Sequence, residues 1–512
     1  MSFGGVKRLN SIVLLLVVFL VSCIADDLEK LKKTQWTPEL ALPLIDSRFD
    51  VSRVFSRAFE DGALLSGSDG LITMVYSGEL FRLKADEFIS FQDFEIDLAL
   101  AQGELPFINK GMLLKHLDFD KGILEVHIEE ALIQDVLVTI NMPRSTKNGI
   151  PFKETFVMHY KGQSSTIFDT IFFLDGYSFD LTGPGGQQSN QININYEAIS
   201  VNGGQVVDLD VCRLKFRDLS FLFLDGYLGK LDLGSYNDSL DLTIFENFKS
   251  GSIILEDPKI NFRVDNSFGF PISLTFNNFS GSGVGGNSNL DGDIIDNGID
   301  VGSPVDTTNS IVTTEEINSG NSNIGNFLSI TPNSINFDLN LEANTSNDST
   351  ELNFASKNSE VVGFIDLELP LKGRLDSVIF ENVLDLDLGE AQNANSAIFK
   401  LHAENFFPIG VYMQVYFLND RQEIIDSLIL DGSTIFKEAV TDKAGFSVVP
   451  SIEESYFSII SGRFDIIKNL GKYIRIRAML LTDQSATKSI KIRDNNYLDI
   501  KIGAILRFQR DQ

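Results

Sequence analysis

Apolar and polar residues alternate with a period of two along most of this chain, and long helical periodicity is nearly absent. The pattern is clear in the stretches GILEVHIEE, QININYEAIS, INFRVDN, SINFDLNLEAN and AIFKLHAEN. Such alternation turns one face of a strand toward a core and the other toward water. Phe occurs 41 times and Trp once, which favours filling the space between two sheets. The sequence therefore predicts an all-β protein of tandem, immunoglobulin-like β-sandwich modules.

Two stretches repeat one design around an asparagine. Residues 260–276 alternate up to Asn266, turn through SFGFP and resume as a strand, and residues 399–417 do the same with Asn405 and the turn FFPIG. An asparagine at such a point can hydrogen-bond its own backbone and end the strand pairing. A looser copy has Glu130 at the corresponding position. We therefore predict three related β units, one in each module.

The length of the chain suits about three such modules. Removing residues 1–22 from the 512 leaves 490, and the modules that we predict are 36–211, 212–384 and 385–512. Within the second module, residues 280–323 are rich in Gly, Asn, Asp and Ser and poor in aromatic residues. Such a composition cannot bury a core, so we predict a mobile inserted loop that is available for contacts.

The first twenty-two residues have the layout of an export signal. Lys7 and Arg8 supply a short positive region, and Ile12 to Val21 form a nearly unbroken apolar core. That core is too short to cross roughly 30 Å of hydrocarbon as a mature helix. We therefore predict that residues 1–22 are a signal peptide that is removed during export.

The segment Leu20-Val21-Ser22-Cys23 resembles the lipobox of bacterial lipoproteins. The resemblance implies that the Cys23 sulfur receives a diacylglyceryl group, that cleavage precedes this residue, and that the new amino terminus is acylated. Several acyl chains on one residue would hold the protein firmly to a membrane. The alternative is an ordinary signal whose cleavage site happens to hold a cysteine.

An acidic tether, residues 23–35, begins at the predicted cleavage site. Its Asp26, Asp27 and Glu29 resemble the acidic export signal of surface lipoproteins of the Bacteroidota, which implies transport to the outer leaflet of the outer membrane. A plain solvated tether would use the same residues, and another bacterial group would read them as a signal for retention elsewhere in the envelope. We expect an outer-membrane location that faces the cell exterior.

Acidic residues outnumber basic ones by 71 to 42, which gives a formal net charge of -29. This balance argues against nucleic acid as a partner and against electrostatic docking to anionic headgroups, so membrane attachment must come from lipid. The chain has two cysteines, and acylation of Cys23 leaves Cys212 without a disulfide partner. We expect Cys212 to pack as a small buried hydrophobe rather than to act as a nucleophile.

One stretch has the spacing of a calcium-binding loop, with oxygen-bearing side chains at alternate positions. These residues are Asn287, Asn289, Asp291 and Asp293. Two departures weaken the match, because the first ligand is Asn rather than Asp and Gly298 occupies the place of the closing Glu. A solvated acidic linker is the alternative, so we predict no cofactor and keep calcium as an open possibility.

Enzyme signatures are missing from the chain. His127 lies between Glu125 and Glu129 on the polar face of a predicted strand, a pattern that suits zinc but equally suits an ordinary wet strand. There is no Gly-x-Ser-x-Gly, His-Glu-x-x-His, phosphate-loop or paired-cysteine motif. With four histidines, acid-base chemistry would fall to carboxylate pairs, which spacing alone cannot reveal. We predict no catalytic residues and a protein that is not an enzyme.

The strand, asparagine, proline and strand arrangement resembles the immunoglobulin-like WHy domains of late-embryogenesis-abundant proteins. More broadly, the chain resembles a family of Bacteroidota surface lipoproteins. That resemblance rests on the lipobox and on the segments WTPELALPLIDS, NSFGFPI, NSNIGNFLSITP and NFFPIGVYMQVYFLNDRQEIIDSL. It implies the fold and the cellular location, and it implies no catalytic activity.

We therefore expect a lipid-anchored outer-membrane lipoprotein that acts as a non-catalytic binding or structural accessory, with a protein as its partner. The alternative is glycan binding within a surface nutrient-uptake system. Sugar platforms expose aromatic faces, so the single Trp36 argues against a glycan, while the eleven tyrosines leave it open. A third possibility is lipid carriage in a hollow between sheets.

Overall fold

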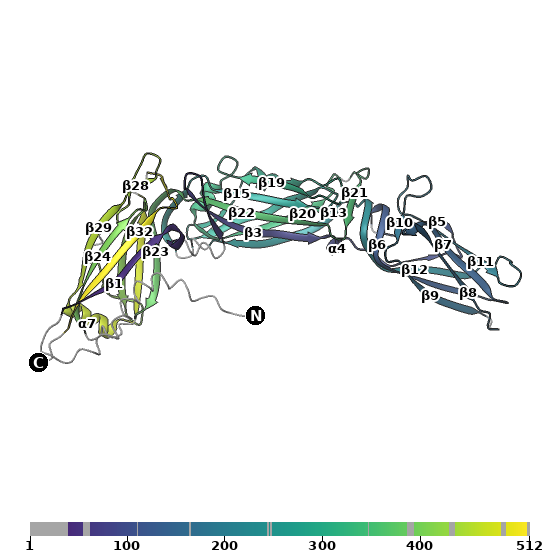
Figure 1. Cartoon of the computed structure of the whole chain (residues 1–512), viewed down its shortest axis with the longest axis horizontal. Coiled ribbons are helices and arrows are strands. Elements are labelled where there is room, and N and C mark those ends of the chain that lie inside the picture. Colours follow the sequence, from purple (N-terminus) through teal and green to yellow (C-terminus); the bar gives the residue numbers. More distant parts are fainter. Residues whose placement is uncertain are drawn as a thin grey trace.

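Three sandwich modules form an extended row, and we call them the proximal, middle and distal modules, from left to right in Figure 1. The computed structural model describes residues 39–54, 62–109, 111–162, 165–242, 245, 248–346, 348–386, 394–429, 436–482 and 488–508. Strands dominate every module, which confirms the all-β prediction. Within these ranges, no helix has the length and apolar character needed to cross a membrane.

The proximal module packs a four-stranded sheet against a six-stranded one. The first sheet has the order β1 (Glu39–Asp50), β32 (Tyr497–Phe508), β24 (Ala394–Asn405) and β29 (Ser451–Ile459). The second has the order β14 (Phe248–Leu255), β23 (Lys372–Asp385), β30 (Tyr473–Leu481), β25 (Gly410–Leu418) and β26 (Ile424–Ser427), with β31 (Ile490–Lys491) beside β23. The helices α3 (Val51–Val54) and α7 (Ser461–Leu470) and the pair β27 (Val440–Thr441) and β28 (Ser447–Val449) flank these sheets.

The middle module contains two five-stranded sheets. One has the order β19 (Ile311–Ile317), β15 (Lys259–Asn266), β22 (Glu360–Pro370), β3 (Ile72–Lys84) and β2 (Gly62–Ser66). The other has the order β13 (Leu231–Asp241), β20 (Pro332–Ala343), β16 (Ile272–Gly283) and β17 (Gly286–Asn289), with β18 (Ile299–Val301) also on β16. Three short helices belong to this module, α4 (Ala85–Phe88), α5 (Asp293–Asn297) and α6 (Ile324–Ser329).

The distal module is a ten-stranded sheet that folds over on itself. One half holds β4 (Phe94–Asp97), β12 (Val211–Tyr227), β6 (Leu113–Glu130) and β9 (Thr166–Phe173), and β21 (Asn353–Ser356) pairs with the near end of β12. The other half holds β8 (Ile150–Met158), β7 (Val136–Lys147), β11 (Gln191–Ser200) and β5 (Gly103–Pro106), and β10 (Ser178–Asp180) joins the halves. Phe156 of β8 stacks on Phe168 of β9 with ring centroids 4.4 Å apart, so the two halves face each other.

The modules are nested along the chain rather than placed one after another. The first described strand, β1, pairs antiparallel with the last, β32, from Glu39 opposite Arg507 to Asp50 opposite Tyr497. From β1 the chain enters the middle module and then forms the distal module. It returns to the middle module at β13, visits the proximal module at β14, and completes that module from β23 onward.

The predicted module boundaries, 36–211, 212–384 and 385–512, are therefore wrong. Residue 212 lies inside β12, which pairs with β6 of the same module along its length. Residue 384 lies inside β23, which pairs with β30 in the proximal module. Consecutive boundaries assume that neighbouring strands in the sequence share a sheet, whereas a nested chain pairs strands that are hundreds of residues apart.

The stretch 280–323, predicted as a mobile loop, forms parts of the middle module instead. It includes β17, β18, β19 and the helix α5. Leu290, Ile299 and Val301 are each at most 3% exposed in the core. A few apolar residues, separated by Gly and Asn turns, are therefore enough to hold this stretch against β16.

The predicted asparagine turns are confirmed, and the two are built alike. The Asn266 side chain accepts a hydrogen bond from the backbone N–H of Phe268 at 2.9 Å and donates to the carbonyl of Phe270 at 3.0 Å. Asn405 accepts from Phe407 N–H at 2.9 Å and donates to the carbonyl of Ile409 at 2.9 Å. Each amide makes one further bond to a distant strand connection, at Gly302 or Lys437. Both asparagines are buried and fully satisfied.

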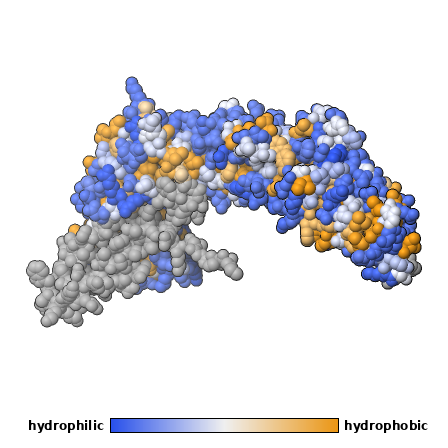
Figure 2. Space-filling model, turned by 45° about the vertical axis from the view of Figure 1, so that its right-hand side comes forward, coloured by the Kyte–Doolittle hydropathy of each residue, from blue (hydrophilic) through white to orange (hydrophobic). Residues whose placement is uncertain are grey.

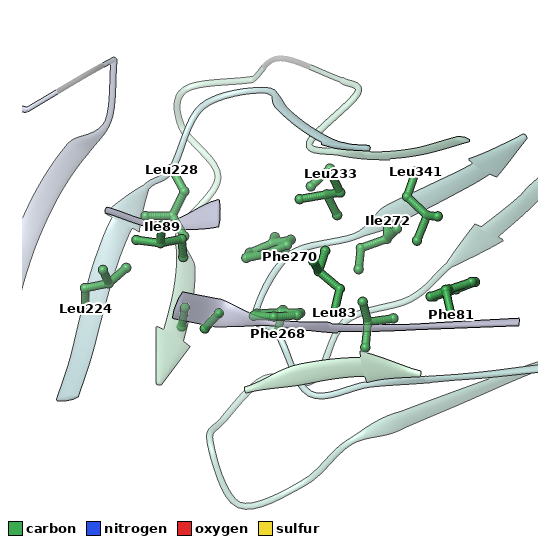
Figure 3. Close-up of a cluster of buried hydrophobic side chains, with 14 of the residues drawn as sticks. Phe81, Leu83, Ile89, Leu224, Leu228, Leu233, Phe268, Phe270, Ile272 and Leu341 are labelled. Atoms are coloured by element: carbon green, nitrogen blue, oxygen red, sulfur yellow. The ribbon is translucent and has the colours of Figure 1, made fainter. Parts of the chain in front are cut away.

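Each asparagine turn lies at a junction between modules. Phe268 and Phe270 stack with ring centroids 4.9 Å apart and pack beside Ile89, Leu224 and Leu228 where the middle module meets the distal one (Figure 3). At the other junction, Phe407 joins the same buried cluster as residues of the middle module. One buried cluster therefore runs through the distal and middle modules and reaches the proximal module at Phe407, which stiffens the row, while the proximal sheets enclose two further clusters of their own.

We expect the Asn266→Ala and Asn405→Ala variants each to lose about 2–4 kcal/mol of unfolding free energy, because buried backbone groups lose their partners. Asn277→Ala is the matched control, since Asn277 is exposed and makes only a long 3.4 Å bond. We expect that variant to stay within about 0.5 kcal/mol of the parent. Urea unfolding followed by circular dichroism measures these differences, and unchanged midpoints in both buried-site variants would contradict the proposed role.

Cys212 packs in the core of the distal module, as predicted. It is fully buried on β12, opposite Ile128 of β6. Burial raises the pKa of the Cys212 thiol to about 12, and the nearby Asp97 carboxylate adds to the rise. The reactive thiolate is therefore scarce at neutral pH.

We expect native Cys212 to resist alkylation at pH 8 in a chain that lacks Cys23, where it is the single thiol. With a pKa near 12, the thiolate fraction at that pH is about one in ten thousand. Iodoacetamide labelling followed by mass spectrometry measures the reaction, and the same chain in guanidinium should label fully. Rapid labelling of the folded chain would show that the thiol is accessible.

Candidate functional site

The predicted lipid attachment residue and export signal, Cys23, Asp26, Asp27 and Glu29, lie outside the described residues. The first described strand nevertheless shows where the described chain begins. Glu39 at the start of β1 lies at the end of the proximal module away from the middle module, whereas Asp50 at the end of β1 lies beside the junction. The described chain therefore begins at the end of the proximal module that lies away from the middle module (Figure 1).

The four calcium-like residues lie in different local structures. Asn287 and Asn289 are exposed residues of β17, paired with β16. Asp291 is bonded to Asn323. The Asn323 side chain accepts a hydrogen bond from the Asp291 backbone N–H at 2.9 Å and donates one to the Asp291 carboxylate at 3.2 Å. Asp293 begins α5, where its carbonyl accepts a bond from Asn297.

Gly298 stands where a closing glutamate would be needed. Its φ is +80°, and an added Cβ would lie 2.3 Å from the Leu274 carbonyl oxygen. A side chain cannot occupy this position without moving β16. Across the described ranges, no group of three or more His, Cys, Asp or Glu side chains is placed to hold a metal ion.

The His127 face of β6 is divided into separate pairs. His127 Nδ1 lies 2.7 Å from an Asp169 carboxylate oxygen on β9. Glu125 pairs with Arg217, at 2.7 Å between Nε and Oε1, and Glu129 accepts a hydrogen bond from Ser165. The two glutamates therefore face other partners, and the three side chains form surface pairs of the kind that contribute little to stability.

A cluster of loops at the far end of the distal module was not predicted. The connections 98–102, 131–135, 159–162 and 201–210 all leave strands at this end, since Val211 pairs with Glu129 and Ser200 with Val136. The opposite end of β12 meets β21 at the junction with the middle module. We call the four connections the distal tip.

The distal tip exposes large apolar side chains. Their exposed fractions are 85% for Leu100, 84% for Ile133, 76% for Val206, 53% for Val201 and 44% for Tyr160. Hydrophobic residues also gather on this end in the face that Figure 2 shows. Single exposed apolar residues are ordinary, but a group on adjacent loops is typical of a protein-binding surface.

Asp135 braces three of the tip connections. Its carboxylate accepts a hydrogen bond from the Tyr160 backbone N–H at 2.8 Å and lies 3.0 Å from His159 Nδ1. Its carbonyl accepts a bond from the Val201 N–H at 2.9 Å. The His159 bond, followed by the Tyr160 N–H, lowers the pKa of Asp135 below its ordinary value. The carboxylate is therefore ionised at neutral pH and holds the exposed side chains in a preorganised arrangement.

The tip could not be recognised from the alternating pattern. Leu100, Ile133 and Val206 are apolar residues between strands, and they look like core positions until the pairing of the strands is known. The one usable signal was their isolation among polar and Gly neighbours, as in the segment SVNGGQVVD. That signal is common in buried loop residues too, so it identifies no surface by itself.

No protein-family model and no curated protein matches this chain. Among solved structures, it is similar to one described as a secreted protein from Parabacteroides distasonis, at 13% identity over 56% of this chain and 90% of that one, with a TM-score of 0.25. It is also similar to a triple jelly-roll protein of an archaeal virus, at 12% identity over 93% and 99%, with a TM-score of 0.11. The N-terminal domain of a Streptococcus gordonii adhesin matches at 8% identity over 94% and 97%, with a TM-score of 0.13. Such TM-scores carry no argument about function.

Proposed function

We propose that this protein is an outer-membrane lipoprotein that is anchored through Cys23 and displays its distal tip to a partner protein outside the cell. One observation carries the proposal. The start of β1, the first described strand, lies at one end of the row, and the exposed apolar tip lies at the other. In a chain of consecutive modules, by contrast, the first and last strands would lie in different modules rather than at the same end of the row.

The stiffness and the charge of the row support display. The core is continuous from the distal module through the middle module to Phe407. A net charge of -29 disfavours lying flat on anionic lipid headgroups, so the row is expected to project from the membrane. A stiff row that projects from its anchor keeps the tip at a distance from the bilayer.

The chemistry of the tip favours a protein over a glycan as the partner. Four of its five exposed apolar residues are aliphatic and the fifth is Tyr160. Sugar platforms depend on aromatic faces, whereas aliphatic side chains on braced loops suit the apolar core of a protein interface. A partner that covers an exposed aliphatic side chain removes apolar surface from water, which contributes favourable free energy to binding.

We expect protease treatment of intact cells to digest the native protein and to spare a variant with Asp26→Ala, Asp27→Ala and Glu29→Ala. The reason is that the acidic residues of the tether direct export to the outer leaflet. Immunoblotting before and after treatment measures the protected fraction, and an inner-membrane protein controls for lysis. Protection of the native protein would place the tip inside the envelope and sink the display model.

We expect a photocrosslinking amino acid at Ile133 to trap one discrete protein adduct on cells. The same amino acid at Val312, a 51% exposed residue of β19 in the middle module, is the matched control and should give none. Mass spectrometry of the adduct identifies the partner. Equal adducts from both positions would show general crowding, and retention of the protein on one polysaccharide in a panel would favour the glycan alternative.

A further inference from the structure

The proximal module contains an apolar cavity of about 270 Å³ that the display function does not use. Its lining comes from the β14 and β23 wall, from the turn after Asn405, and from Met74 of the middle module. Carbon atoms make up nearly all of this lining. Protein interiors are close-packed, and an apolar void of about 150 Å³ is already large enough to stay dry and bind benzene. A void of this size is therefore unusual in a protein core and calls for a structural or functional explanation.

The wall of the cavity is shaped by backbone irregularities. β14 and β23 change register twice, between Phe248 and Ser250 and again between Ser250 and Ser252. Gly251 has a φ of +113°, and a Cβ there would lie 2.5 Å from the Ser377 carbonyl oxygen. Such bulges bend a strand and increase its twist, which opens space between facing sheets. The cavity is therefore part of the backbone design of the module and does not follow from one undersized side chain.

The cavity also has an open side. Ile253, Leu255 and Phe380 of the wall are only half-buried, as are Val411 and Leu480 on the strands beside them. A ligand in the cavity would cover these side chains and remove their apolar surface from water. A cavity with an apolar interior and a partly solvated rim suits a ligand with a hydrocarbon body.

The polar residues that line the cavity disfavour a ligand with a polar body. Both functional atoms of the Asn405 side chain are engaged by backbone groups of the protein. Lys372 Nζ is bound by the carboxylates of Glu256 and Asp257, at 3.1 Å and 2.7 Å. Arg374 contributes to the lining, is half-buried, and makes no ion pair with any described residue.

We propose that this cavity binds a single acyl chain, with the anionic head group of the lipid at the rim beside Arg374. The acyl chain has two possible sources, a free lipid of the envelope or the lipid that the proposed function places on Cys23. Fifteen residues lie between Cys23 and Glu39, and the sixteen steps from one to the other allow a reach of up to about 54 Å. The length of β1, 12 residues, spans about 40 Å, so the tether is long enough to return to the junction.

The test uses the chain from residue 24 onward, produced without acylation and stripped of lipid. We expect cis-parinaric acid to bind with a stoichiometry of one and to raise the melting temperature. Val378→Phe and Val411→Phe place a ring into the cavity and should each weaken binding at least tenfold. Val383→Phe is the matched control, since Val383 is on β23 but outside the lining and 38% exposed, and it should bind as the parent does.

Folding of each variant is checked by thermal unfolding, because a filled cavity should hold or raise the melting temperature. Arg374→Gln should weaken the binding of cis-parinaric acid about fivefold or more and leave the binding of the matching uncharged alcohol unchanged. Absence of saturable binding in the parent, or full affinity in both folded cavity-filling variants, would overturn the proposal. The display model stands or falls separately, since this assay involves neither Cys23 nor the tip.

The source of the acyl chain is identified with the same protein preparation, analysed before lipid is removed. Native mass spectrometry that finds a fatty acid or phospholipid on the parent, and none on Val411→Phe, supports the site and assigns it to a free lipid. Probe binding without any co-purified lipid supports the site and assigns it to the protein's own acyl chain. Lipid carried equally by the parent and by Val411→Phe would place it outside the cavity and count against the proposal.

Discussion

Two buried asparagine side chains are the constraint on which the rest of this molecule depends. Asn266 and Asn405 each close a turn by bonding backbone groups on both sides of it. The turns place Phe268, Phe270 and Phe407 in the shared core at the two junctions. An amide suits this task because it offers both a donor and an acceptor, whereas a carboxylate could only accept. Without these bonds, buried carbonyls would be left unpaired at the points where the modules meet.

The nested topology determines the order in which the modules can be completed. The strands β4 to β12 of the distal module are continuous in sequence, so they can pair among themselves early. The proximal module has to wait, since β1 pairs with β32 at the other end of the chain. Such distant pairs carry a large loop-closure cost and make late steps slow. The proximal module is therefore expected to be completed last.

The alternating pattern predicted the fold class and the asparagine turns, because both depend on local sequence. A strand with one apolar face has a period of two wherever it lies, and Asn266 and Asn405 bond mostly within four residues of themselves. The boundaries at 212 and 385 are wrong because strand pairing is non-local, and the residue pattern of a single strand does not indicate which strand it pairs with. The stretch 280–323 was misjudged because composition averages over the few buried residues, such as Leu290 and Ile299, that fix it in place.

The acidity of the chain and the apolar tip together narrow the kind of partner that fits. Exposed aliphatic side chains such as Leu100 and Ile133 invite association with any apolar surface, including a second tip. Two copies that met by their tips would bring together two bodies of charge -29, and this repulsion disfavours self-association at low ionic strength. The same field attracts a partner with basic residues around an apolar centre. Under the proposed display function, a neutral or basic protein surface therefore fits the tip better than another acidic one.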